Sequence, residues 1–306
     1  KEIPSWERGK IVGNVFQDPR SQFFANEVAG EVAFGCENYG YSHEEIRNHV
    51  HRAAADIKIQ DILDHSLHSL SYGMRQKVAI ASAEAIDPEI YVMDEPSANL
   101  DIASTYRFAD IIRALKQQGK TIIIAEHRLY YLMDLADRFL CVQKGKIVRE
   151  FTAPQMKALT NQKIQTLGLR TPDLHQIEYM EIPSAATSEV VLEVKKLNHS
   201  FGETIVAKDV DFQCRKGEVV ALIGPNGTGK STIGRILAGL LKEKSGEVVL
   251  FGKHCRPKGR LGKVWYIPQD LDSQLFGEDL LDELTTGAEV SPERKQAAEE
   301  ILEALE

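Results

Sequence analysis

The chain has 306 residues and a formal net charge of −8, from 37 Lys and Arg against 45 Asp and Glu. Apolar residues make up 43% and charged residues 27%, which indicates a soluble globular protein of about two domains and excludes a disordered or fibrous chain. No run approaches the ~18 consecutive apolar residues of a membrane-spanning helix, and the acidic balance argues against a dedicated nucleic-acid binder.

The first half of the chain alternates predicted strands and helices, which favours an α/β fold with a mainly parallel sheet. The helix over 102–117 has apolar residues at helical spacing and ends at Gly119, a natural helix stop. In chain order, the predicted elements are a strand-like run at 11–16, a polar helix over 42–57, a helix that begins within LSYGMRQ at 70–76 and runs to 86, a strand at 90–93, the helix over 102–117, and strands at 121–125 and 139–142.

The segment 170–188 lacks periodicity and carries Pro172, Pro183 and several small polar residues, so we predict a linker there. The alternation then restarts. The predicted elements are a strand beginning with VVLEVKKL at 190–197, a strand at 219–223, a helix over 230–241, a strand at 247–250, a strand-like run at 263–268 and a helical segment at 291–306.

One passage occurs twice. QDPRSQFFANEVAGEVAFG at 17–35 and QDLDSQLFGEDLLDELTTG at 269–287 share seven identities in nineteen positions, where unrelated segments share about one. Each copy follows a strand-like run and precedes a polar helical segment. The offset of 252 residues is too large for a solenoid, so we interpret the passage as part of a duplicated domain.

The sequence GPNGTGKST at 224–232 matches the phosphate-binding pattern GxxxxGK[ST], and it follows a predicted strand and opens a predicted helix, as the motif requires. Gly224, Gly227 and Gly229 let the backbone aim N–H groups at phosphate oxygens. Lys230 would reach the β- and γ-phosphates, and Ser231 would reach Mg²⁺. The other residues of this nucleotide-binding loop are Pro225, Asn226, Thr228 and Thr232.

Two features concern the base of the nucleotide. The sequence has no NKxD-type element of the kind that reads guanine, which favours adenine. Phe201, in LNHSFGE upstream of the loop, is placed to stack on the base, with a position in the core as the alternative. We therefore predict ATP and Mg²⁺ as the cofactors.

Three further motifs indicate a family. LSYGMRQ at 70–76 opens a helix, IYVMDE at 90–95 ends an apolar strand in two carboxylates, and IIIAEHR at 122–128 places a histidine just beyond a buried strand. With the repeated passage, their order and spacing resemble the nucleotide-binding domains of ABC transporters over nearly the whole chain outside the linker. The resemblance implies an α/β P-loop NTPase fold with a mainly parallel sheet, a β-rich N-terminal subdomain and a helical signature subdomain.

The resemblance also implies roles for the residues of these motifs. Asp94 would orient Mg²⁺ and its water, while Glu95 would act as the general base that activates the attacking water. His127 would be the switch histidine that contacts the γ-phosphate. A capping or solvated acidic pair is the alternative for the two carboxylates.

Four more residues receive roles from the same resemblance. Gln17 and Gln269 would touch Mg²⁺ and couple the site to a membrane partner. Ser71 and Gly73 would offer a hydroxyl and an N–H to the γ-phosphate of ATP bound by the opposing domain. The signature departs from the usual LSGGQ, since Tyr72 stands where the family has a glycine.

The motifs divide the chain into the C-terminal portion of a first nucleotide-binding domain at 1–169, the linker at 170–188 and the N-terminal portion of a second such domain at 189–306. The first portion has no phosphate-binding loop and the second has no signature, and a chain beginning at Lys1 without a signal peptide suggests a fragment truncated at both ends.

Two arrangements of these portions stay open. In the head-to-tail pairing of the family, Lys230 would face Ser71 while Glu95 would belong to the other site, which predicts ATP binding without turnover. Alternatively, the second portion completes the first in permuted order, within one chain or in a dimer, since a 19-residue linker spans up to ~60 Å.

Within the family, QDPRSQFF and AEHRLYYL resemble the energy-coupling ATPases of vitamin and metal-ion importers. We therefore predict a cytoplasmic ATPase, peripheral on the inner face of the cell membrane, that works with transmembrane subunits and with a second nucleotide-binding domain or a homodimer partner. The alternatives are a nucleotide-dependent clamp of DNA repair or translation, and an ATP-binding module without turnover.

The scattered cysteines predict reduced thiols. The basic residues Arg256, Lys258, Arg260 and Lys263 are predicted to form a solvated hairpin.

Overall fold

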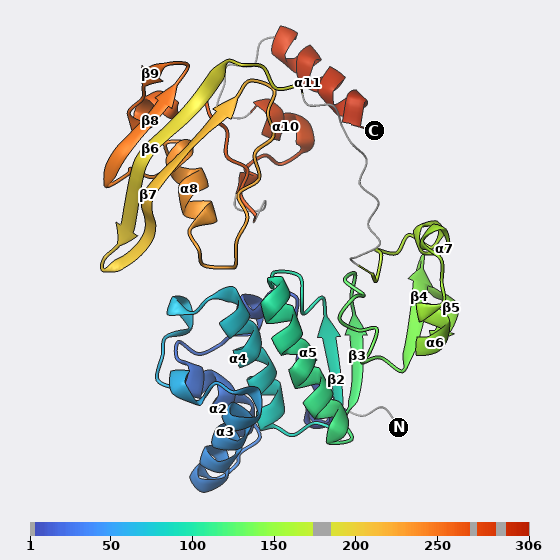
Figure 1. Cartoon of the computed structure of the whole chain (residues 1–306). Coiled ribbons are helices and arrows are strands. Elements are labelled where there is room, and N and C mark those ends of the chain that lie inside the picture. The colour runs from blue at the N-terminus through green and yellow to red at the C-terminus, as the bar shows by residue number, and fades with distance from the viewer. Residues whose placement is uncertain (1–3, 174–184, 270–273, 286–291, 306) are drawn as a thin grey trace. The chain divides into compact units, whose positions relative to one another are not determined.

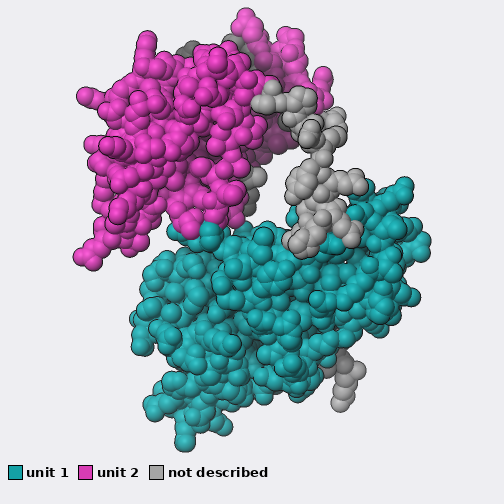
Figure 2. All heavy atoms as spheres, in the orientation of Figure 1, with its two compact units in different colours: residues 1–182, 225–227 teal, residues 183–224, 228–306 magenta. Residues whose placement is uncertain are grey.

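The computed structural model describes residues 4–173, 185–269, 274–285 and 292–305. It divides into two compact units, residues 1–182 with 225–227 and residues 183–224 with 228–306 (Figure 2). The division at 169/170 and 188/189 inferred from the motifs stays a prediction. Parts of the second copy of the repeated passage, 270–273 and 286–287, lie outside the described residues.

The first unit combines a parallel sheet, a helical bundle and a hairpin (Figure 1). Its elements are α1 (Ser5–Ile11), β1 (Val12–Val15), η1 (Pro19–Gln22), α2 (Val28–Asn38), α3 (His43–Ile57), η2 (Gln60–Ile62), η3 (Leu67–Ser69), α4 (Tyr72–Ala85), β2 (Ile90–Asp94), α5 (Ile102–Gln117), β3 (Thr121–Ala125), β4 (Arg138–Gln143), β5 (Lys146–Thr152), α6 (Ala153–Lys157) and α7 (Asn161–Thr166).

The three strands β1, β2 and β3 lie in that order and are all parallel. On β2 the side chains alternate, so that Tyr91 and Met93 are fully buried while Val92 is partly exposed. The register pairs Asp94 with Ala125 at the last rung of β2 and β3. Since the strands are parallel, their carboxyl ends share one edge of the sheet, and the segments that follow them begin side by side.

Most α-helices of this unit begin at a residue whose side chain caps the helix. Ser42 forms a capping box with Glu45 at the start of α3, and the side chain of Ser71 accepts a hydrogen bond from the Met74 amide at the start of α4. Helix α4 packs on α2, α3 and β1, and its buried alanines allow close approach. The predicted helical signature subdomain therefore exists as α2, α3 and α4.

The second unit is built on an antiparallel sheet of strand order β7-β6-β8-β9. Helix α8 covers it through a cluster in which Ile236 meets Val194, Leu197 and Val248. Its elements are β6 (Val190–Phe201), β7 (Thr204–Arg215), α8 (Lys230–Leu237), β8 (Ser245–Leu250), β9 (Lys253–His254), α9 (Pro257–Arg260), α10 (Leu280–Thr285) and α11 (Pro292–Leu305). This sheet is the predicted β-rich subdomain.

Three predicted elements of the second unit differ in the structure. No strand forms at 219–223, where Val219 is 96% exposed and Ile223 is 89% exposed, and none forms at 263–268. Both runs are apolar, but the described sheet of this unit is antiparallel and pairs neither of them, and a strand requires a hydrogen-bonded neighbour. Helix α8 ends at Leu237 rather than 241, because the chain turns at Gly239 with a φ of 80°.

Two smaller predictions have different outcomes. The four cysteines all lie in the described residues and are free, as predicted. The predicted basic hairpin at 256–263 is wrong, because residues 257–260 form the short helix α9; Arg260 is also fully buried, and its Nη2 forms an ion pair with Glu243 Oε2 at 2.5 Å.

Candidate functional site

In the first unit, the structure brings three of the predicted site residues together at the carboxyl edge of the parallel sheet. His127 Nε2 lies 3.0 Å from Glu95 Oε1, and Gln17 Nε2 donates to Glu95 Oε2 at 3.2 Å. Glu95 follows β2, His127 follows β3, and Gln17 lies just beyond β1. Both oxygens of one carboxylate are thus held by residues that follow the two other strands.

Glu95 is also unusual in its backbone. Its φ is 38°, in the left-handed region that costs a residue with a Cβ about 1–2 kcal/mol. Its amide donates to Ala125 O at 2.9 Å, and its carbonyl accepts from Ala98 N at 3.0 Å. These bonds hold the strained residue where the chain leaves the sheet, and such strain is typical of functional positions. Asp94 is the last residue of β2 and is exposed.

The signature residues lie at the start of α4. Ser71 caps the helix with its side chain, and Gly73 is in the first turn, where an added Cβ would meet Leu100 Cδ2 at 3.5 Å. The hydroxyl of Tyr72, the residue that departs from the usual signature, donates to the backbone carbonyl of Gln17. Tyr72 therefore ties the signature to the segment that holds Glu95. Burial raises the pKa of Tyr72, which keeps this donor protonated.

The phosphate-binding loop precedes α8. Gly227 and Gly229 have φ values of 82° and 90°, and Gly224 has a φ of 153°. A Cβ at Gly229 would lie 2.3 Å from Val206 O, so only glycine fits there. Lys230 Nζ donates to Gly224 O at 2.7 Å, from one end of the loop to the other. The loop thus has the backbone freedom and the lysine that a phosphate cradle needs.

The other residues predicted for this site lie around the loop. Ser231 is exposed and Thr232 half-buried in the first turn of α8, where the amide groups of a helix start favour an anion. Pro225, Asn226 and Thr228 are exposed. Phe201 ends β6 half-exposed, with its ring edge-on to His199 at 4.9 Å between centroids. Gln269 is exposed, and its role stays a prediction.

Comparison with protein families tests the resemblance inferred from the motifs. The ABC transporter family profile matches residues 1–98 and 207–306, which is well over half of the chain. The chain belongs to the ABC transporter ATP-binding family. The P-loop NTPase fold inferred from the motifs is therefore confirmed, as is the family resemblance. Members of this family are ATPases.

Two curated relatives cover nearly all of this ABC chain. An ABC transporter ATP-binding protein of Treponema denticola is 36% identical over 299 residues, which are 96% of this chain and 61% of the relative. YkoD of Bacillus subtilis, named as an HMP/thiamine import ATP-binding protein, is 29% identical over 318 residues, with 95% and 58% covered. The chain thus spans about three-fifths of the length of the relatives it matches.

Among solved structures, CbiO1 from Clostridium perfringens, described as part of the ABC transporter complex cbiONQ, is 30% identical. The match covers 53% of this ABC chain and 65% of that chain, with a TM-score of 0.47. None of the helices in the described part of the chain combines the length and the apolar character needed for a membrane crossing.

Each unit of the ABC chain, taken by itself, offers an oxygen donor of the kind that Mg²⁺ takes together with a nucleotide. Mg²⁺ prefers oxygen ligands and is usually held by one or two carboxylates or hydroxyls plus substrate phosphates. Asp94 offers an exposed carboxylate and Ser231 an exposed hydroxyl in the first turn after the phosphate-binding loop. Among the described residues there is no cluster of three or more His, Cys, Asp or Glu side chains that would hold a metal by itself.

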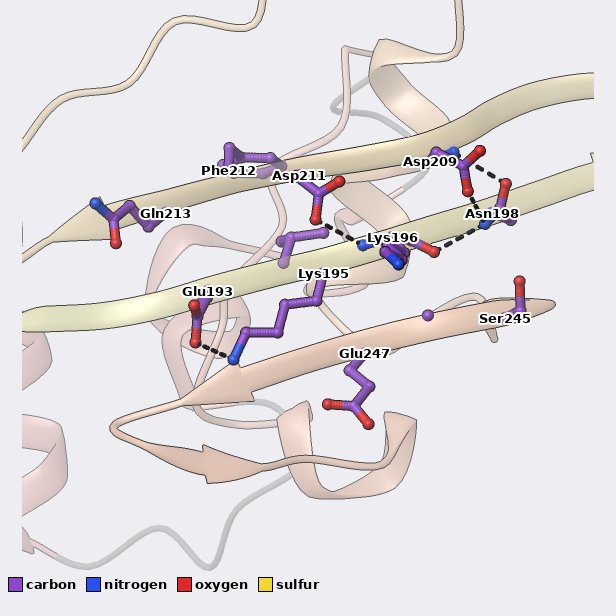
Figure 3. A pocket seen from close by; sticks show the side chains of 12 residues that line it. Glu193, Lys195, Lys196, Asn198, Asp209, Asp211, Phe212, Gln213, Ser245 and Glu247 are labelled. Atoms are coloured by element: carbon purple, nitrogen blue, oxygen red, sulfur yellow. Dashed lines mark hydrogen bonds and ion pairs between the residues drawn. The ribbon is translucent and has the colours of Figure 1, made fainter.

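A broad, open groove of about 1020 Å³ lies elsewhere, on the antiparallel sheet of the second unit (Figure 3). Half of the residues that line it are charged, and several of these already have partners. Lys195 Nζ bonds Glu193 Oε2 at 2.9 Å, and Asp211 Oδ1 accepts from the Lys196 amide at 2.9 Å. It contains none of the motif residues, so it is not the nucleotide site.

The motifs gave no role to four residues that surround His127 and the loop after Glu95. Glu126, Arg128, Tyr131 and Ser97 form a hydrogen-bonded network between the segments that leave β2 and β3. The sequence feature that could have identified two of them is the position of Glu126 and Arg128 on either side of His127. Hydrogen-bond partners that come from another strand are not visible in a local motif.

Proposed function

We propose that the chain supplies ATP-binding and ATP-hydrolysing parts of the subunit that powers a membrane importer of the energy-coupling type. Its cargo would be a vitamin or a metal ion, and it would work as a peripheral protein on the cytoplasmic face of the membrane. The family membership supports the ATPase class, and the name of the Bacillus subtilis relative supports import of a vitamin or its precursor.

The observation that carries this proposal is the position of the Glu95 carboxylate. It lies at the end of a parallel strand, about one-third exposed and held through both oxygens by His127 and Gln17. A carboxylate in this position can take a proton from an attacking water, and the imidazole beside it can orient the γ-phosphate. When bound, Mg²⁺ would supply charge neutralisation for the phosphate oxygens.

The second unit supports ATP binding. Lys230 starts α8 and lies at the mouth of the glycine-rich loop, so its ammonium can exchange the Gly224 carbonyl for phosphate oxygens. The helix start and the loop amides add further positive potential. Phe201, half-exposed at the end of β6, offers a ring face for adenine.

Exposed phenylalanines in the segment that contains Gln17 support a membrane partner. Phe24 is 73% exposed and stacks on Phe34 with 4.7 Å between ring centroids. Phe16, next to Gln17, is also exposed. Exposed large apolar side chains are typical of interaction surfaces, and Phe16 directly precedes the glutamine that holds Glu95.

The test is steady-state hydrolysis of Mg·ATP together with equilibrium binding of ATP. We expect Lys230→Ala to weaken ATP binding and Glu95→Gln to leave binding intact. Turnover abolished by both substitutions would mean that the two residues act in one site. Binding without turnover would support the head-to-tail arrangement, in which Lys230 and Glu95 serve different sites. Failure to bind ATP would refute the proposal.

Two other functions give different results in simple assays. A DNA-repair or translation clamp predicts binding to nucleic acid that weakens steeply with salt. Burial of Arg260 leaves only three solvent-facing members in the basic segment at 256–263, which disfavours that reading. A binding module without turnover predicts ATP affinity with no hydrolysis even when a transmembrane subunit is supplied. Co-purification with a transmembrane subunit would favour the importer.

A further inference from the structure

The segments that leave β2 and β3 are joined by one guanidinium. Arg128, the residue after His127, donates through Nη1 to Ser97 O at 3.1 Å and to Leu100 O at 3.0 Å, and through Nη2 to Ala98 O at 2.8 Å. All three acceptors belong to the loop at 96–101, which leads from Glu95 to α5. The planar fork of arginine suits this arrangement, whereas the single ammonium of lysine does not.

The residue before His127 completes the same connection. Glu126 Oε2 accepts from Ser97 Oγ at 2.6 Å and from the Tyr131 hydroxyl at 2.9 Å. Its other oxygen, Oε1, accepts from the amides of His127 at 2.8 Å and Arg128 at 2.9 Å. One carboxylate therefore fixes the backbone at the histidine and also holds the loop at 96–101 by its serine.

Burial strengthens this network. Ser97 is fully buried and Tyr131 is 4% exposed, so their hydroxyls have little access to competing water. Burial raises the pKa of Tyr131, and the charge of Glu126 raises it further, so the phenol remains a donor. His127 itself is exposed between the two anchored residues, with its ring toward Glu95. The residues on either side of His127 are thus held by several hydrogen bonds each, whereas His127 faces the solvent.

We propose that Glu126 and Arg128 are positioning residues: their hydrogen bonds join the loop at 96–101 to the segment at 126–131, so that the two segments move together. The loop begins directly after Glu95, and the Glu95 carbonyl accepts a hydrogen bond from Ala98 N. The joined segments therefore set the position of His127 relative to the Glu95 carboxylate. Anything that displaces the loop at 96–101 would then displace the histidine as well. The consequence for ATP hydrolysis rests on the proposed function, whereas the mechanical connection does not.

The mechanical connection is tested in the whole chain by hydrogen exchange, without nucleotide. Arg128→Ala removes the three bonds to the loop, and Glu126→Gln weakens acceptance from Ser97. We expect each substitution to speed exchange in both segments, 96–101 and 126–131, by about tenfold. Arg128→Lys keeps the charge but places all its N–H donors on one nitrogen, which cannot reach the three carbonyls as the guanidinium does, so it should give an intermediate increase. If each substitution loosened only its own segment, the proposal would be wrong.

A matched control separates positioning from general stability. Arg52 Nη2 also donates to a backbone carbonyl of the first unit, Glu84 O at 3.3 Å, but on α3, away from the sheet edge. Arg52→Ala should leave exchange in both segments unchanged. If Arg128→Ala and Arg52→Ala instead sped hydrogen exchange throughout the first unit to the same extent, the proposal would be wrong, and Arg128 would have a general structural role.

A spectroscopic readout addresses His127 directly. The imidazole Cε1–H resonance, assigned by comparison with His127→Ala, should move in Arg128→Ala and Glu126→Gln and stay in place in Arg52→Ala. An unchanged resonance in the first two variants would refute positioning of the histidine. Where the chain hydrolyses Mg·ATP, Arg128→Ala should lower kcat and leave KM unchanged. Absence of turnover in the unsubstituted chain counts against the proposed function alone, since exchange and resonance still decide this inference.

Discussion

The two units hold their functional residues by different means. In the first unit, Glu95 and His127 follow paired parallel strands, and their side chains are fixed by other side chains. In the second unit, the segment at 218–224 pairs with no strand among the described residues, and Gly229, just before Lys230, keeps its position only because it has no Cβ to meet the Val206 backbone. Removing one side chain from a hydrogen-bonded cluster leaves the other bonds in place. A glycine whose position has no room for a Cβ can be replaced by almost no other residue.

The largest expected effect tests that contrast at Gly229. In Gly229→Ala, the new Cβ would lie 2.3 Å from Val206 O, and the residue would have to keep a φ of 90°. The loop must shift, so the amides no longer aim at phosphate. We expect ATP affinity to fall on the order of 100-fold, measured by titration calorimetry.

Gly252→Ala is the matched control for this substitution. Gly252 also has a positive φ, 74°, but an added Cβ would meet nothing within 4 Å. The variant should lose about 1–2 kcal/mol of the free energy of unfolding from backbone strain and keep its ATP affinity. Equal loss of affinity in both variants would show that strain alone, and not the clash with Val206, controls the loop.

The next effect concerns a buried pair that joins β2 and α4. The Tyr91 hydroxyl, on β2, donates to Glu84 Oε2, on α4, and both residues are at most 2% exposed. In Tyr91→Phe, Glu84 loses its donor inside the core. We expect the free energy of unfolding of the first unit to fall by about 1–3 kcal/mol. Urea unfolding followed by NMR through the amide signals of α4 would measure it.

The loss should depend on pH. Burial raises the pKa of Glu84 above its ordinary value of 4.5, and the Tyr91 hydrogen bond and the charge of Arg52 lower it in part. For an acid with a raised folded-state pKa, the stabilising contribution is complete below the unfolded pKa and is lost as pH rises through the folded pKa. Removing the Tyr91 hydroxyl raises the pKa further. The deficit should therefore be larger at pH 8 than at pH 5.

A control for this pair is Tyr106→Phe, because Tyr106 is half-exposed on α5. It also removes a tyrosine hydroxyl from the first unit, but it leaves no buried carboxylate without a donor. We therefore expect no pH-dependent change in stability. A deficit in Tyr91→Phe that is the same at pH 5 and pH 8 would mean that Glu84 does not titrate in this range.

The sequence predicted those features that are local in the chain. Asp94, Glu95 and His127 belong to motifs that resemble those of the ABC family and that end strands in carboxylates or a histidine, and parallel strands bring such ends to one edge. Their roles stay predictions. The same reading missed Glu126 and Arg128, because their partners lie on the segment after a different strand. It also predicted a strand at 219–223, since apolar periodicity reports burial and does not show whether a neighbouring strand is present.

The smallest expected effect separates two kinds of polar contact in the groove of the second unit (Figure 3). Asn198 Nδ2 donates to Lys196 O at 2.8 Å and to Asp209 Oδ1 at 3.0 Å, while its Oδ1 accepts from Asp209 N at 2.9 Å. Lys196 and Asp209 have φ values of 45° and 46°, so one amide stabilises two strained residues on β6 and β7.

Asn198→Ala should therefore cost about 1 kcal/mol and speed hydrogen exchange of β6 and β7 near this point. Lys195→Ala removes an exposed ion pair with Glu193 from the same groove, and exchange there should not change measurably, because water and salt screen such a pair. Equal effects of the two substitutions would mean that the groove is held by its charges. Unequal effects in the expected order would mean that backbone bonding shapes the second unit here, as it does in the loop before Lys230.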